Sequence, residues 1–128
     1  MSVGRFLILA AVVHGLIGLV AFAAPSAMAG VFGVAVDPGG AAVVRLLGAT
    51  LIGIAAVFWW SRDLVAAQGV RGVLVGGAVV NLLSFLVVVA ALAGDVMAPR
   101  AWVGAVVRLL FALGFAWFAF LRPPKEPA

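Results

Sequence analysis

Residues 101–121 have the sequence AWVGAVVRLLFALGFAWFAFL. The stretch contains no acid and no proline, and its one charged residue is Arg108. Because a helix rises about 1.5 Å per residue, a helix of this length spans about 30 Å, the thickness of the hydrocarbon core of a bilayer. The stretch therefore predicts a membrane-spanning helix.

Three more apolar stretches of similar length lie upstream, at about residues 6–24, 43–60 and 71–93. The connections between them are short, which favours antiparallel neighbours. We therefore expect an all-α protein in which residues 1–128 form one transmembrane domain, an up-down-up-down four-helix bundle. Between the first two spans, residues 28–36 are apolar but too short to cross, and they predict an interfacial segment that precedes a turn at residues 37–40.

Composition excludes several classes of protein. The chain is 67% hydrophobic and 9% charged, with a mean hydropathy of +1.36, whereas soluble domains average about half apolar and a quarter charged. The eight basic residues give a net charge of +4, yet they are scattered at segment boundaries, which argues against nucleic acid as a partner and for the lipid bilayer. The absence of cysteine excludes disulfide exchange, iron–sulfur clusters and cysteine-ligated zinc.

The first apolar run admits two interpretations. Arg5 precedes it, as in the n-region of a secretory signal peptide, and Ala27-Met28-Ala29 is an A-x-A cleavage site. The run is longer than a typical signal-peptide core, however, and His14 interrupts it. We favour a retained transmembrane helix, and cleavage of residues 1–29 stays open.

The distribution of Lys and Arg predicts the orientation. Five of these residues lie on the side of the two termini and the middle connection, and two lie on the other side: Arg5, Arg62, Arg71, Arg122 and Lys125 against Arg45 and Arg100. Since basic residues are retained on the cytoplasmic side, we expect a multi-pass protein of the bacterial cytoplasmic (inner) membrane with both termini in the cytoplasm.

Arg108 is the charged residue that most needs an explanation. Arg at the centre of a spanning helix costs about 2.5–3.5 kcal/mol. Its guanidinium either reaches lipid phosphates and loop carbonyls by snorkelling or serves as a charged anchor inside the bundle. Arg45, Asp37 and Asp95 are expected near the same side. These four residues predict either ion pairs that close the bundle or a site for an anion or lipid headgroup, because guanidinium matches such groups in bidentate fashion.

Polar side chains are also expected near the midplane. Gly77, Asn81 and Ser84 share one face of the third predicted helix, a pattern typical of helix–helix contact and, alternatively, of a substrate path. His14 lies at a similar depth, where hydrogen bonding to a neighbouring helix is the simplest role. A proton relay would need more titratable groups, and a haem would need better-placed axial ligands, so we expect neither cofactor nor metal.

Small residues recur, with Gly72 and Gly76 forming a GxxxG pair that suits close helix packing or self-association. No nucleotide-binding loop, nucleophile elbow, H-E-x-x-H or pair of acids within a span is present. These absences favour a protein that is not an enzyme.

A local pattern resembles small, uncharacterised four-helix integral membrane proteins of high-GC bacteria. Ala24-Pro25 ends one span, Arg45-Leu46-Leu47-Gly48-Ala49 begins the next, and Trp60-Ser61-Arg62-Asp63 follows it. The resemblance implies the four-helix architecture and supplies no activity.

We therefore expect a non-enzymatic small membrane protein, an accessory subunit of a larger membrane complex or a homo-oligomer. The alternative is a small carrier or anionic-lipid-binding protein that uses Arg45 and Arg108.

Overall fold

The computed structural model describes residues 1–63 and 67–122. In chain order the elements are α1 (Val3–Ala23), α2 (Pro25–Val31), α3 (Pro38–Ser61), α4 (Ala67–Ala93), the 3-10 helix η1 (Pro99–Ala101), α5 (Trp102–Ala116) and the π-helix η2 (Trp117–Leu121). Four segments are long and apolar enough to cross a membrane: Val3–Ala23, Pro38–Ser61, Gly69–Ala93 and Pro99–Leu121. The predicted all-α four-helix bundle is confirmed, and the chain is a multi-pass membrane protein.

The start of α3 differs from the sequence prediction for a local reason. The helix begins at Pro38 and not near residue 43, although two glycines follow the proline. Asp37 is the N-cap, and its Oδ1 accepts a hydrogen bond of 2.7 Å from the amide of Gly40. Because proline at the first helical position has a suitable φ and lacks only an N–H that would be unpaired, the Asp-Pro sequence starts a helix here. Residues 37–40 are thus the first turn of α3.

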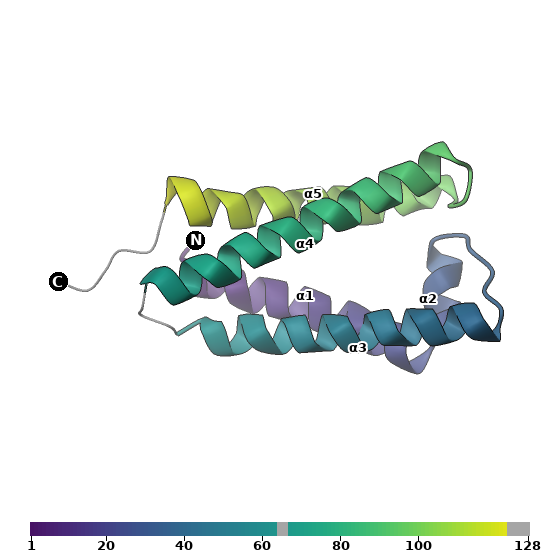
Figure 1. Ribbon diagram of the computed structural model, residues 1–128, viewed down its shortest axis with the longest axis horizontal. Coiled ribbons are helices and arrows are strands. Elements are labelled where there is room, and N and C mark those ends of the chain that lie inside the picture. The colour runs from purple at the N-terminus through teal and green to yellow at the C-terminus, as the bar shows by residue number, and fades with distance from the viewer. Residues whose placement is uncertain (64–66, 123–128) are drawn as a thin grey trace.

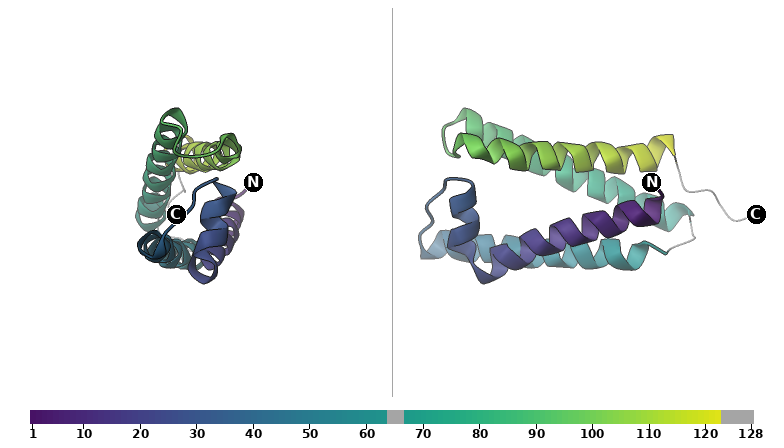
Figure 2. Two further views of the ribbon diagram at one scale, coloured as in Figure 1. Left: turned by 90° about the vertical axis from the view of Figure 1, so that its right-hand side faces the viewer. Right: turned by 180° about the vertical axis from the view of Figure 1, so that it is seen from behind.

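The four long helices form two antiparallel pairs. α1 packs along α3 and α4 packs along α5, whereas α3 and α4 share few contacts (Figure 1). The two pairs lie in separate layers, as the view from behind shows (Figure 2). The start of α1 and the end of η2 lie at one end of the molecule, which we call the terminal end. α2 and the turn between α4 and α5 lie at the other, which we call the α2 end.

Direct backbone contact joins α1 to α3. A Cβ on Gly48 would lie 2.6 Å from the amide nitrogen of Phe22 and 2.7 Å from the carbonyl oxygen of Gly18. A Cβ on Gly18 would likewise lie 2.9 Å from the carbonyl oxygen of Gly48. In lipid the hydrophobic effect does not drive helices together. Helices associate there through van der Waals contact, which such a close approach of two backbones supplies.

An aromatic cluster joins the two pairs. Phe6 from α1 packs against Phe115 from α5, with ring centroids 4.7 Å apart, and Phe58 from α3 lies 4.9 Å from the same ring. Phe111 and Phe118 of the second pair extend the cluster along Phe6. Because these rings fill the space between the layers, the two pairs meet through side chains.

At the α2 end, α2 is fastened to the turn before α5. The Arg100 guanidinium donates from Nε to the carbonyl of Val31 at 2.9 Å and from Nη2 to the carbonyl of Gly30 at 2.8 Å. The amide of Ala98 donates to the carbonyl of Phe32 at 2.9 Å. Gly33, at φ +76°, lies against Ala98 where a side chain would collide. A cation at the last carbonyls of a helix is favourable, so Arg100 both caps α2 and links the two pairs.

Candidate functional site at the centre of the bundle

The most unusual side chain in the interior is His14, which projects from the middle of α1. It is 1% exposed, and its ring packs edge-on against Phe58 and Phe111 at centroid distances of 5.4 and 5.3 Å. Nδ1 lies 2.8 Å from the carbonyl oxygen of Ala10. Since a carbonyl only accepts, Nδ1 is the donor, and in the neutral ring Nε2 is left as an acceptor. Among the described residues Nε2 has no hydrogen-bond partner.

Asn81 and Arg108 complete the polar group. Asn81 is fully buried on α4, and its Nδ2 donates to the carbonyl of Gly77 at 2.9 Å. Its Oδ1 accepts a hydrogen bond of 3.3 Å from Nη1 of Arg108 on α5. His14 contacts Phe111, which lies one turn along α5 from Arg108. We call these three residues the central cluster; they come from three helices and meet between the two layers.

The charge of the central cluster is not balanced from within the membrane-spanning segments. The acids of the chain are Asp37, Asp63, Asp95 and Glu126, and none falls within the four spans. In the part of the chain that the structure describes, the only ion pair joins Arg62 to Asp63, at 3.2 Å. Arg108 is half-buried and contributes five N–H donors. The centre of the bundle therefore has one cation, a surplus of donors and one unsatisfied acceptor.

The structure places the residues of the predicted anion or ion-pair site separately. Asp37 caps α3, and Asp95 follows α4 in a left-handed conformation with φ 55°. Arg45 is exposed on α3, and Arg108 turns inward to Asn81. Neither arginine lies within ion-pair distance of either acid in the described structure. An anion site that includes Arg45 stays a prediction.

The Gly–Asn–Ser face of α4 is directed at α5 over part of its length. A Cβ on Gly77 would lie 2.6 Å from the ring of Phe115, and Asn81 bonds Arg108. Ser84 is half-buried. The sequence placed His14 and Asn81 at similar depth, but it grouped Arg108 with the loop residues. It gave Arg100 no role beyond topology, and its attachment to α2 had no sequence signal.

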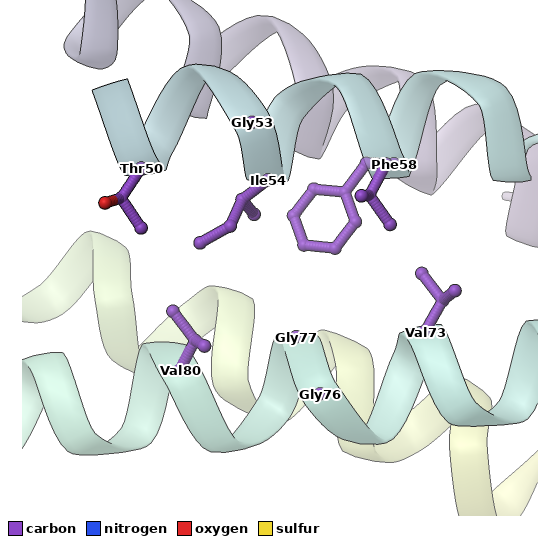
Figure 3. Close-up of a pocket in the computed structure, with 9 residues that line it drawn as sticks. Thr50, Gly53, Ile54, Phe58, Val73, Gly76, Gly77 and Val80 are labelled. Atoms are coloured by element: carbon purple, nitrogen blue, oxygen red, sulfur yellow. The ribbon is translucent and has the colours of Figure 1, made fainter. Parts of the chain in front are cut away.

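The GxxxG pair lies on open surface. Nothing approaches within 4 Å of the Cβ position of Gly72 or of Gly76. Gly76 lines an apolar cleft of about 400 Å³ between α3 and α4 (Figure 3). The cleft is lined by Thr50, Gly53, Ile54, Val57, Phe58, Val73, Gly76, Gly77 and Val80. Ile54 and Phe58 of α3 face Val73 and Val80 of α4 across it.

Comparisons with known proteins add no further assignment. No family model, no curated protein and no solved structure matches the chain. Since a four-helix architecture by itself does not imply a function, the function must be inferred from the cleft and the central cluster.

Proposed function

We propose that the protein acts without catalysis, as a small membrane subunit that associates in the bilayer with a second copy of itself through the face formed by α3 and α4. The observation that carries the proposal is the open cleft between these helices, with glycines along its edge. α3 and α4 are also the least covered spans: 17% of the apolar centre of α4 is buried, compared with 39% for α1.

The glycines of this face make a close helix contact available. Gly72 and Gly76 are one turn apart on α4, and Gly53 lies across the cleft on α3, all without a neighbour within 4 Å. Helices in lipid associate where small residues let two backbones approach and gain van der Waals contact. An interface around a two-fold axis presents the same face from both subunits, so one such face suffices for a dimer.

An accessory role beside a different protein is the second interpretation of the same face. The alternative of a carrier built on Arg45 and Arg108 has less support, because Arg45 is exposed on α3 while Arg108 bonds Asn81 inside the bundle. The cleft also has apolar walls, which suit a helix or hydrocarbon better than a hydrophilic substrate.

The location that we propose is the bacterial cytoplasmic membrane, with both termini in the cytoplasm. The support is that Arg5, Arg62, Arg71 and Arg122 gather at the terminal end, where the start of α1 and the end of η2 lie side by side (Figure 1). Arg45, in the first third of α3, and Arg100 lie toward the α2 end. This asymmetry is the charge bias that sets the orientation of multi-pass proteins.

Disulfide cross-linking in liposomes tests the self-association. The chain has no cysteine, so each single variant carries one thiol. We expect Gly72→Cys or Gly76→Cys to form a dimer on oxidation, because neither new side chain meets an obstacle. The matched control is Leu110→Cys on α5, a position that is 63% exposed but lies on another helix.

The comparison between these positions is decisive for the dimer. Cross-linking of the α4 variants should exceed that of the control and persist when the lipid-to-protein ratio is raised. Equal yields at all three positions would remove self-association. Cross-linking of the α4 variants to another protein in native membranes, with none in liposomes, would replace the dimer with an accessory role.

A further inference from the structure

The central cluster has a chemical composition that the proposed association does not use. It holds a cation at Arg108, a buried acceptor at His14 Nε2 and an amide, Asn81, whose two ends are already bonded. A buried acceptor that has no partner is destabilising, and an Arg in the middle of a span adds its own cost. Intramembrane ionisable residues commonly mark a binding site.

From this arrangement we propose that His14, Asn81 and Arg108 bind the carboxylic acid group of a membrane-dissolved, long-chain amphiphile, such as a fatty acid. The group supplies what the cluster lacks. Its carbonyl oxygen accepts from the Arg108 guanidinium, and its O–H donates to Nε2 of His14. Asn81 holds the guanidinium in place through the bond to Oδ1. A carboxylic acid carries the acceptor and the donor on two separate oxygens, whereas an alcohol carries both on one oxygen.

The depth of the cluster argues for a ligand that arrives through the lipid. His14 lies in the middle of Val3–Ala23 and Asn81 in the middle of Gly69–Ala93, so both are far from either membrane surface. An ionised small acid does not reach that depth, whereas a long-chain acid in its neutral form dissolves in hydrocarbon. Arg108 is half-buried, so part of it is exposed to the surroundings, whereas His14 and Asn81 are fully buried.

The surroundings strengthen the contact once it forms. Phe58 and Phe111 pack edge-on against His14 and keep water away from the imidazole. Hydrogen bonds to a charged donor are stronger in such a low-dielectric site than in water. The inference goes beyond the proposed self-association and does not depend on it.

Binding of radiolabelled palmitic acid to delipidated protein in dodecyl maltoside micelles tests the inference. The informative variant is Asn81→Asp, which places a carboxylate within hydrogen-bond distance of Arg108 and so holds the guanidinium away from a ligand. We expect its affinity for palmitic acid to fall about tenfold or more, since a charge-assisted hydrogen bond is lost. The control is Arg45→Gln, which removes an exposed arginine outside the cluster and should bind as the wild type does.

Three competitors define the ligand chemistry. Unlabelled palmitic acid should displace the probe, while methyl palmitate, which has no O–H, and acetate, which has no chain, should compete at least tenfold less well. Equal competition by the ester would overturn the head-group chemistry. Equal competition by acetate would overturn the lipid-borne source in favour of a small free acid.

A second measurement needs no variant and so does not depend on folding of Asn81→Asp. The chain has one histidine, so protein labelled with ¹⁵N-histidine gives two ring-nitrogen signals that belong to His14 alone. Palmitic acid should shift the Nε2 signal and leave Nδ1, which is bonded to Ala10, nearly unchanged. An unshifted Nε2 signal at saturating palmitic acid, or wild-type affinity in a folded Asn81→Asp variant, would overturn the inference.

Discussion

The crossing of α1 and α3 offers the sharpest test of what holds the bundle together. In Gly48→Ala, the new methyl group would lie 2.6 Å from the amide nitrogen of Phe22 and 2.7 Å from the carbonyl oxygen of Gly18. Both obstacles are backbone atoms, so no side-chain rotation relieves the collision and α1 must move as a whole. Overpacking of a close contact costs about 1–3 kcal/mol, and we expect the upper part of that range.

Gly53→Ala, on the same helix, is the matched control. Nothing lies within 4 Å of its Cβ position, so alanine gains only helix propensity. That gain is about 0.5–1 kcal/mol, and the two substitutions should therefore change the free energy of unfolding in opposite directions. The double variant Gly18→Ala/Gly48→Ala should lose less unfolding free energy than the sum of the losses in the two single variants, because one displacement of α1 relieves both collisions.

Unfolding in mixed micelles of dodecyl maltoside and sodium dodecyl sulfate, followed by far-UV circular dichroism, measures these differences. The protein is kept dilute so that association does not contribute. If Gly48→Ala and Gly53→Ala fall within about 0.5 kcal/mol of each other, backbone contact at this crossing does not stabilise the pair, and the account of α1 and α3 is refuted.

Two further predictions concern the α2 end and the orientation. Arg100→Gln removes the two hydrogen bonds to the carbonyls of Gly30 and Val31. Because Arg100 is exposed, we expect the local stability to fall by about 1 kcal/mol, which would make amide exchange near Phe32 roughly fivefold faster. Arg45→Gln is the control, and unchanged exchange in Arg100→Gln would contradict the prediction. In intact cells, an impermeant maleimide should label Val96→Cys at the α2 end and should label Asp63→Cys only after permeabilisation, and the reverse pattern would place the termini outside.

The position of α1 bears on the signal-peptide question. Phe6, Leu7, Ala10 and His14 of this helix are buried among residues of the other spans. Cleavage after residue 29 would remove the partner of α3 at Gly48 and one member of the central cluster. Cleavage of residues 1–29 therefore decides whether these two features exist in the mature protein.

The local features of this chain were predictable because each depends on a short run of residues. Hydropathy over about twenty residues predicts a span, since every turn of a helix in lipid must be apolar. The predicted spans and the four-helix architecture agree with the structure. The start of α3 was predicted too late because Asp37-Pro38-Gly39-Gly40 has the composition of a turn, whereas the Asp37 side chain makes it a helix cap.

Hydropathy and spacing alone were enough to predict four helices that cross the bilayer, with His14 and Asn81 near its middle. The folded arrangement was needed to show which helices are partners, that Arg108 turns to Asn81, and that Gly72 and Gly76 stay uncovered. Lipid surrounds every helix with the same apolar environment, so all faces of a spanning helix are similarly apolar. Hydropathy therefore does not predict which face of the helix contacts another helix. Which face a helix turns toward its neighbour depends on shape. Gly18 and Gly48 allow two backbones to approach, and Phe115 fills the space between helices. Such contacts form only between helices that are distant in sequence.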